Sequence, residues 1–182
     1  MKDKTKRVSK FMSYVLRHNP QEIDLQLDEN GWVSIEQLIN NANSGGKSFT
    51  RDLIERVVAT NDKKRFSISE NGLMIRANQG HSIDVDLALK PLIPPAVLLH
   101  GTAEKHLELI MADGLKKMDR HHVHLSENSE TASAVGRRYG KLVLLKIDAK
   151  KMHENGFVFY KSDNNVWLVD SVPVEYLTIV EN

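Results

Sequence analysis

The hydrophobic pattern of the first half of the chain predicts three helices. Apolar side chains recur every three or four positions over residues 8–16, and Asn19-Pro20 ends this first helix because proline cannot continue it. A second helix is expected after Ser34, which forms a capping box with Gln37. A third is expected after Thr50, a favourable N-cap residue.

Strand patterns complete this half. Apolar and polar residues alternate over 23–27, which predicts a short strand. Strand-like segments at 66–68 and 73–76 flank Glu70-Asn71-Gly72, which predicts a hairpin. The order helix, strand, helix, helix, hairpin matches a winged helix, a helix-turn-helix variant that usually binds nucleic acid.

The second half predicts short strands with interspersed helices, which is typical of an α+β fold. Strands are expected at 97–99, 123–125 and 142–147, helices at 103–111 and 129–139, and a hairpin from 157–160 and 166–169. Pro91, Pro94 and Pro95 interrupt any regular element between the halves. We therefore expect two lobes, 1–90 and 91–182, in an α+β protein.

Composition narrows the function classes. The chain has 182 residues, enough for one domain or two small ones. It contains no cysteine, which excludes disulfides, thiolate metal sites and a cysteine nucleophile. The longest apolar run, residues 93–99, is far shorter than the roughly 20 residues of a membrane helix, and the N-terminus has no signal-peptide pattern. We expect a cytoplasmic protein without membrane contact.

Charge is unevenly distributed. The net charge is +1, but residues 1–20 carry six Lys or Arg and one Asp, a local net charge of +5. Such a patch can bind an acidic partner or be the solvated face of a helix.

Histidines gather in the second half, where His100, His121, His122 and His124 form a set. Tetrahedral metal sites take three or four protein ligands. His122 and His124 alternate on a predicted strand without a third ligand at a suitable spacing, so we expect no metal.

Three groups of cations could hold phosphate. Arg17 and His18 close the first helix, Lys63-Lys64-Arg65 precedes the hairpin, and Arg120 precedes the histidine cluster at 121–124. Arginine offers fork-like donors and histidine a titratable one. Cations at a helix C-terminus also stabilise the helix dipole, so both interpretations stay open.

Two further segments could hold a ligand. His100-Gly101-Thr102 is expected at a strand end, where glycine would permit close approach, Thr102 would cap a helix and the helix N-terminus would favour a pyrophosphate. The polar loop Arg76 to Ser82, with Asn78, Gly80 and His81, could cradle a ligand or be a plain loop. Neither segment is a dinucleotide fingerprint or a P-loop.

Together these residues resemble the RNA (tRNA) 2′-phosphotransferase family of the KptA type, which removes the splice-junction 2′-phosphate from tRNA with NAD. Seven stretches carry the resemblance in order: Ser9 to His18, Asp28 to Trp32, Lys63 to Phe66, Ile75 to Ser82, Leu99 to Thr102, Arg120 to Ser126 and Val166 to Leu168.

The resemblance implies a winged-helix lobe for RNA, an ADP-ribosyltransferase-like lobe, and NAD in the cleft between them. It implies a catalytic tetrad of Arg17, His18, Arg65 and Arg120. It places NAD contacts on one set of residues in each lobe: Arg76, Asn78, Gly80 and His81, then His100, Gly101, Thr102, His124 and Ser126. Protein-modifying relatives of this fold carry a glutamate on the strand that corresponds to Val166-Trp167-Leu168, where this chain has no acid.

The implied reaction has two steps. The RNA 2′-phosphate displaces nicotinamide from NAD, which gives 2′-phospho-ADP-ribosylated RNA. Transesterification then releases 2′-hydroxyl RNA and ADP-ribose 1″,2″-cyclic phosphate. The implied partners are a tRNA-like RNA with a 2′-phosphate and NAD, without a metal, and we expect a monomer.

Two alternatives stay open at this point. The chain could be an ADP-ribosyltransferase that modifies a nucleic-acid terminal phosphate or a protein and stops after the first step. It could also be a non-catalytic winged-helix protein that binds nucleic acid.

Overall fold

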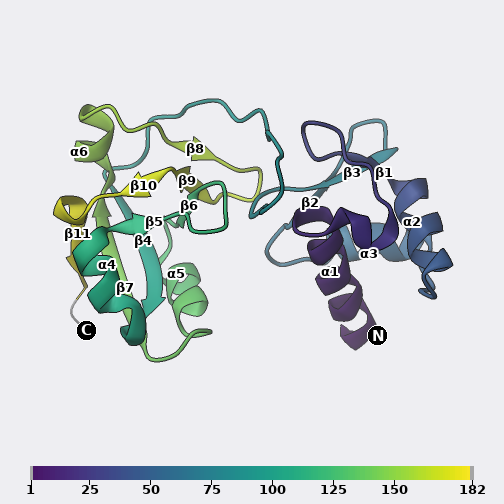
Figure 1. The fold of residues 1–182 in the computed structure, drawn as a ribbon, viewed down its shortest axis with the longest axis horizontal. Helices are drawn as coiled ribbons and strands as arrows, with labels where there is room; N and C mark the ends of the chain where they lie inside the picture. Colours follow the sequence, from purple (N-terminus) through teal and green to yellow (C-terminus); the bar gives the residue numbers. More distant parts are fainter. Residues whose placement is uncertain (1, 181–182) are drawn as a thin grey trace. The chain divides into compact units, whose positions relative to one another are not determined.

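Internal contacts divide the chain between residues 88 and 89, beside the Pro91–Pro95 segment (Figure 1). The structure is a computed structural model that describes residues 2–180, apart from the side chains of Lys2 and Asp3 in the basic N-terminal segment. We describe the two units, here the first unit and the second unit, separately.

The first unit is built from helices and one small sheet. Its elements are α1 (Lys2–Arg17), the 3₁₀ turn η1 (Pro20–Ile23), β1 (Val33–Ser34), α2 (Ile35–Ser44), α3 (Arg51–Ala59), β2 (Phe66–Ile68) and β3 (Met74–Ala77). The strands form an antiparallel sheet in the order β1-β3-β2. Helix α1 buries Met12, Val15 and Leu16 in a core shared with α2, α3 and β3.

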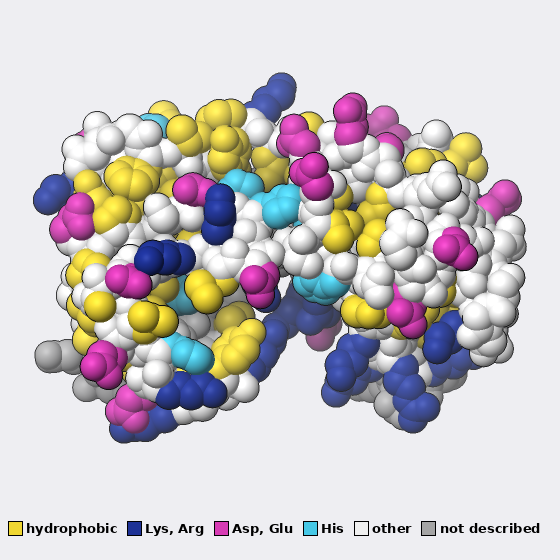
Figure 2. All heavy atoms as spheres, in the orientation of Figure 1, with side chains coloured by type: hydrophobic (Ala, Val, Ile, Leu, Met, Phe, Trp, Pro, Cys, Tyr) yellow, Lys and Arg dark blue, Asp and Glu magenta, His cyan; other side chains and the backbone are white. Residues whose placement is uncertain are grey.

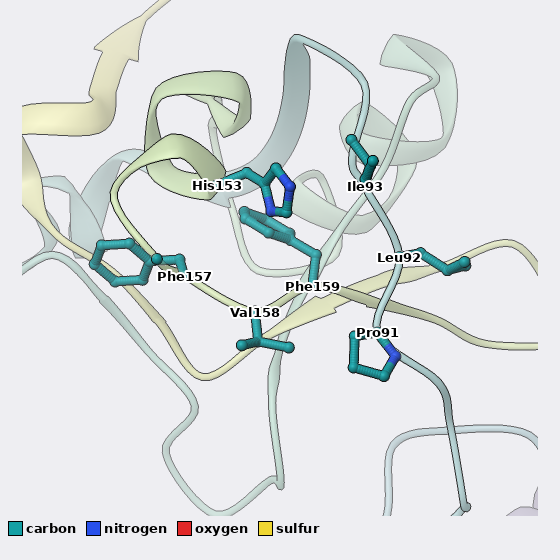
Figure 3. A pocket seen from close by; sticks show the side chains of 8 residues that line it. Pro91, Leu92, Ile93, His153, Phe157, Val158 and Phe159 are labelled. Carbon is teal, nitrogen blue, oxygen red and sulfur yellow. The ribbon is translucent and has the colours of Figure 1, made fainter.

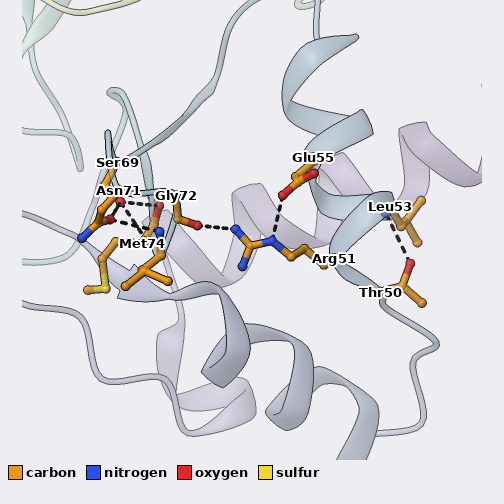
Figure 4. Close-up of polar contacts among 9 residues, drawn as sticks. Thr50, Arg51, Leu53, Glu55, Ser69, Asn71, Gly72 and Met74 are labelled. Atoms are coloured by element: carbon orange, nitrogen blue, oxygen red, sulfur yellow. Dashed lines mark hydrogen bonds and ion pairs between the residues drawn. The ribbon is translucent and has the colours of Figure 1, made fainter.

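Local capping chemistry starts two of these helices where the sequence predicts. The Ser34 hydroxyl accepts from the backbone N–H of Gln37 at 3.4 Å, and that of Thr50 accepts from Leu53 at 3.3 Å. Figure 4 shows the second cap. These bonds satisfy donors that the first helical turn leaves without partners.

The predicted hairpin between β2 and β3 is confirmed (Figure 4). Gly72 adopts a φ of +72°, which glycine tolerates without strain. The Asn71 side chain accepts from the N–H of Leu73 at 3.0 Å, and Arg51 of α3 donates to the Gly72 carbonyl. Arg51 also pairs with Glu55 at 2.8 Å, so α3 and the hairpin turn are linked.

The strand predicted over 23–27 is wrong. Pro20 begins η1, and the chain then reverses at Asp24, whose φ is +51°. Proline fits the first position of a helical turn, so Asn19-Pro20 ends one helix and opens another. The strand of this region is β1, which pairs with β3 through Val33 and Ser34.

The second unit contains short strands in three antiparallel sheets. Its elements are β4 (Val97–Ala103), η2 (Glu104–His106), α4 (Leu107–Asp113), β5 (Leu115–Lys116), β6 (Val123–Leu125), α5 (Ser129–Gly136), β7 (Leu142–Asp148), α6 (Ala149–Glu154), β8 (Tyr160–Lys161), β9 (Trp167–Val169), β10 (Ser171–Val172), η3 (Val174–Tyr176) and β11 (Leu177–Ile179). The sheet orders are β11-β7-β4, β6-β9-β8 and β10-β5.

Two glycines set how closely α5 lies against β4. A Cβ on Gly101 would overlap the carbonyl oxygen of Ala132, and one on Gly136 would lie 2.7 Å from the Thr102 oxygen. Real Cβ contacts are not this short, so both positions require glycine. Helix α5 therefore packs backbone against backbone on the strand.

The coarse fold prediction, α+β, is confirmed by mixed helices and antiparallel sheets. The hairpin of β8 and β9 is confirmed too.

Helix α5 ends at Gly136, three residues before the predicted Tyr139. The sequence did not predict β5, β10, β11 or α6. No helix within residues 2–180 is long and apolar enough to cross a membrane.

Candidate functional site

In the first unit, Arg17 and His18 lie at the C-terminal end of α1 beside two other segments. The Arg17 guanidinium donates to the Arg65 carbonyl at 3.5 Å, and the Arg17 carbonyl accepts from the Ser82 N–H at 2.9 Å. The His18 Nδ1 lies 2.9 Å from the Ser82 hydroxyl. The structure therefore places the end of α1, with Arg17 and His18, against the backbone of Arg65 and the end of the 76–82 loop.

Arg65 is held by the turn that follows α3. Its guanidinium donates to the Asn61 side-chain oxygen at 3.3 Å. Partial burial lowers the pKa of Arg65, and the nearby Asp62 carboxylate opposes this shift. Arginine stays charged in proteins, so Arg65 presents a partly desolvated cation that favours an anionic partner.

Asn78 is almost fully buried, with 3 % of its surface exposed. Its side-chain N–H donates to the Lys64 carbonyl at 2.7 Å, and its backbone N–H donates to Arg65 at 2.9 Å. The side-chain oxygen of Asn78 has no hydrogen-bond partner. A buried acceptor left unpaired costs about 1–3 kcal/mol, so this oxygen is suited to a ligand N–H.

The remaining predicted ligand residues of this unit surround Asn78 in the chain. Arg76 lies in β3, one position before its end, with its guanidinium carbon 4.7 Å from the centre of the Trp32 ring. Gly80 adopts a φ of +85° and turns the loop, and His81 is 98 % buried with its Nε2 beside Gly31.

In the second unit, His100 of β4 and His124 of β6 lie together with Arg120, which belongs to the loop before β6. The His100 Nδ1 lies 3.0 Å from the His124 carbonyl oxygen, which can only accept, so His100 Nδ1 carries the proton. Arg120 donates to His124 Nδ1 at 3.0 Å. Because arginine has no acceptor, the neutral His124 ring carries its proton on Nε2.

Burial makes His100 resist protonation. Desolvation is the largest cause that lowers its pKa below the usual 6.5, Arg120 lowers it further, and the bond to the His124 carbonyl opposes both. A base with a lowered native pKa costs stability once the unfolded chain can protonate. We expect the melting temperature to fall as pH drops below about 6.5 and to level off below the native pKa.

The measurement is a series of thermal melts between pH 8 and pH 5. His122, whose pKa burial also lowers, contributes in the same direction, so the wild-type slope is a sum. The His100→Gln variant has no titrating ring at this position and should show a smaller slope. An unchanged slope in that variant would contradict the assignment to His100.

The structure corrects the role expected for Gly101 and Thr102. Both lie inside the seven-residue strand β4 rather than at its end, and Ala103 is the N-cap residue of η2. Thr102 is 94 % buried and caps no helix. Gly101 does permit close approach, and the segment that approaches it is α5.

Ser126 lies beside β4 and begins a loop held by an acid that the sequence did not single out. Ser126 and Leu99 exchange two backbone hydrogen bonds at 2.8 and 2.9 Å. The next residue, Glu127, accepts from the Trp167 indole at 2.6 Å and from Lys161 at 2.9 Å. These donors lower the pKa of Glu127, which thereby ties this loop to β8 and β9.

An apolar hollow in the second unit is separate from these residues (Figure 3). It is lined by Pro91, Leu92, Ile93, His153, Gly156, Phe157, Val158 and Phe159. None of the predicted site residues lines it. Across residues 2–180, no group of three His, Asp or Glu side chains is arranged to hold a metal ion.

Sequence reasoning gave no role to Asn61, Trp32 or Glu127, which hold Arg65, Arg76 and the loop after Ser126. Trp32 lies within a stretch that carries the family resemblance, and this was the available indication. Asn61 and Glu127 act through contacts that folding creates, and no local pattern marks them.

Comparison with known protein families decides the assignment. Residues 3–171 match the model of the "RNA 2′-phosphotransferase, Tpt1 / KptA family". The chain belongs to this family.

Curated relatives match nearly the whole length of the chain. A protein of Acaryochloris marina is 54% identical over 181 residues, covering 100% of both chains, and one of Rhodopirellula baltica is 57% identical over 171 residues, covering 93% of each. A third, of Pseudomonas fluorescens, is 54% identical over 170 residues, again 93% of each. All three carry the name "Probable RNA 2′-phosphotransferase". The family consists of transferase enzymes.

Proposed function

We propose that this protein is an NAD-dependent RNA 2′-phosphotransferase. The observation that carries the proposal is the contact in the first unit between the end of α1, which carries Arg17 and His18, and the backbone of Arg65 and Ser82. Guanidinium groups bind phosphate oxygens through paired donors. Family membership supplies the substrate class, an RNA that carries a 2′-phosphate.

Winged-helix and ADP-ribosyltransferase-like folds for the two units are part of this proposal. The order α1, β1, α2, α3, β2, β3 with one three-stranded antiparallel sheet supports the first. Small antiparallel sheets with short helices support the second. Each unit holds part of the predicted tetrad, so we expect residues 1–90 and 91–182 to be inactive when produced separately.

NAD would be the second substrate, consumed in the reaction. The buried Asn78 oxygen could accept from an amide or amino N–H, which nicotinamide and adenine both carry. Arg76, Gly80, His81, His100, Gly101, Thr102, His124 and Ser126 stay predictions as NAD-binding residues.

The first step transfers ADP-ribose to the RNA. An oxygen of the RNA 2′-phosphate forms a bond to the anomeric carbon of the nicotinamide ribose, and the bond to nicotinamide breaks with its electron pair. The phosphate is ionised at neutral pH and needs no base. Arg17 and Arg65 would reduce the repulsion between the two anionic substrates by binding the phosphate.

The second step releases the RNA. The 2″-hydroxyl of the ribose attacks phosphorus and gives its proton to water, and the bond from phosphorus to the RNA 2′-oxygen breaks with its electron pair on that oxygen. Charge increases on the phosphate oxygens, where oriented arginine donors stabilise the transition state. His18 would donate the proton that the leaving RNA oxygen needs, with its ring oriented by Ser82. The products are 2′-hydroxyl RNA and ADP-ribose 1″,2″-cyclic phosphate.

The test is an incubation of the full chain with an oligonucleotide that carries one internal 2′-phosphate, with and without NAD. We expect 2′-hydroxyl RNA, nicotinamide and the cyclic phosphate in equal amounts, and no reaction without NAD. The yield should be the same in EDTA. Phosphate removal without NAD would refute the proposed reaction.

The same assay tests the alternative that the protein stops after the first step. A stable ADP-ribosylated RNA without cyclic phosphate would identify an ADP-ribosyltransferase. The same product formed on an oligonucleotide with only a terminal phosphate would identify the terminal phosphate as the acceptor.

A further inference from the structure

Basic side chains form a line along α1 that leads away from Arg17. Lys6, Lys10 and Arg17 are spaced by four and seven residues, which places them on one face of a helix with 3.6 residues per turn. The opposite face carries the buried residues Val8, Met12, Val15 and Leu16. We call Lys6, Lys10 and Arg17 the basic stripe.

Ion pairing within the described part of the protein does not explain why lysine stands at positions 6 and 10. Both are exposed, and among the described side chains no carboxylate forms an ion pair with either of them. The space-filling view shows Lys and Arg side chains gathered over α1 (Figure 2). Two exposed cations on the same face as Arg17 raise the local positive potential and attract an anionic chain.

The loop after α3 lies along the edge of this face. Asn61 donates to the Ser9 hydroxyl at 2.9 Å, which fixes the loop against the middle of α1. The loop then presents Lys63 and Lys64, with one acid, Asp62, beside them. Lys64 adopts a φ of +41°, a costly conformation for a non-glycine residue that tends to persist where function requires it.

We infer that the basic stripe, flanked by Lys63 and Lys64, binds the backbone phosphates of the single-stranded RNA that adjoins the 2′-phosphorylated nucleotide. This inference rests on the proposed function, because it takes Arg17 as the position of the reacting phosphate. From Arg17 to Lys6 the helix rises by 11 residues, or about 16 Å at 1.5 Å per residue. A stacked strand at 3.4 Å per nucleotide covers this distance with about five nucleotides.

Lysine side chains of the basic stripe are suited to contact the phosphates of a nucleic acid rather than its bases. An ammonium group on a flexible stem binds phosphate as a point charge and does not read the base. The stripe therefore adds affinity that depends on strand length and salt, and does not depend on sequence. The basic stripe therefore favours substrates with more nucleotides beside the 2′-phosphorylated one.

The test compares two variants that lose the same charge. Lys6→Ala/Lys10→Ala removes the two outer members of the stripe. Lys4→Ala/Lys150→Ala removes one exposed lysine from another face of α1 and one from α6 in the second unit. Fluorescence anisotropy without NAD measures the affinity of each for labelled RNAs with one internal 2′-phosphate, lengthened separately on the 5′ and 3′ sides.

We expect the stripe variant to bind RNA with six flanking nucleotides about tenfold more weakly than wild type, as two exposed ion pairs allow. Its affinity for a dinucleotide, which is too short to reach Lys10, should change less than twofold. The salt dependence should fall by about 1.4 in the log–log slope, since each phosphate contact on a single strand contributes about 0.7. The control variant should match wild type throughout.

Three results would overturn the inference: unchanged affinity for long RNA, an equal loss for the dinucleotide, or an equal loss in the control. The gain in wild-type affinity should appear on one side of the reacting nucleotide and level off near five nucleotides. Binding is measured without NAD and does not depend on catalysis. A protein without activity would refute the proposed reaction, and the binding assay would still test the basic stripe.

Discussion

Replacement of Arg120 by alanine should lower the rate of 2′-phosphate removal by about 10²–10³ while leaving the protein folded. This is the usual cost of losing one donor that stabilises charge in a transition state. Arg120 is exposed and contacts His124, so its removal should cost less than about 1 kcal/mol of stability. Single-turnover assays and thermal melts measure the two effects.

The second step should suffer at least as much as the first, because it places new charge on the phosphate. The expected result is that ADP-ribosylated RNA accumulates and little cyclic phosphate forms. Arg120→Lys keeps the charge without the fork of donors and should recover part of the rate. Arg137→Ala, at the exposed end of α5, is the matched control. Near-normal turnover by a folded Arg120→Ala protein would remove this residue from the site.

Replacement of Gly101 by alanine should destabilise the second unit by about 3 kcal/mol or more. The added methyl group would overlap the Ala132 carbonyl, which is backbone and cannot rotate away as a side chain would. Overpacking costs typically 1–3 kcal/mol even where side chains can adjust. For a unit of this size, the melting temperature should fall by more than about 10 °C.

The control is Gly45→Ala at the end of α2, where the backbone has a φ of −82° and the nearest neighbour of a Cβ lies at 3.4 Å. This change should shift the melting temperature by at most a few degrees. Gly136→Ala would place a Cβ 2.7 Å from the Thr102 oxygen, so it should also destabilise the second unit. A Gly101→Ala protein with the melting temperature of wild type would show that α5 does not lie this close to β4.

Features with a local cause were predictable from the sequence. Ser34 and Thr50 cap helices through bonds to residues three positions later, and Asn71-Gly72 turns a hairpin within four residues. The same reasoning failed at 23–27, because η1 takes up Ile23 and the left-handed backbone of Asp24 then interrupts any extended run. It failed at Thr102, because the register of β4 against β7 carries the strand past the expected end.

Features created by distant contacts were not predictable. The two-residue strands β5 and β10 exist because they pair with each other, and neither has a pattern long enough to read. The Asn61–Ser9 bond joins residues 52 positions apart, and the Glu127–Trp167 bond joins residues 40 apart. The resemblance named residues for the site, but it could not say which side chains would hold them.

The bond from Arg120 to His124 has a consequence for ligand design. It occupies the Nδ1 lone pair, so His124 cannot accept a second hydrogen bond at that nitrogen while the contact with Arg120 is kept. A compound that targets the second unit should therefore not direct a donor at Nδ1 of this ring. An anionic group that binds Arg120 would compete with His124 for the same guanidinium N–H, and would remove a contact that orients the ring.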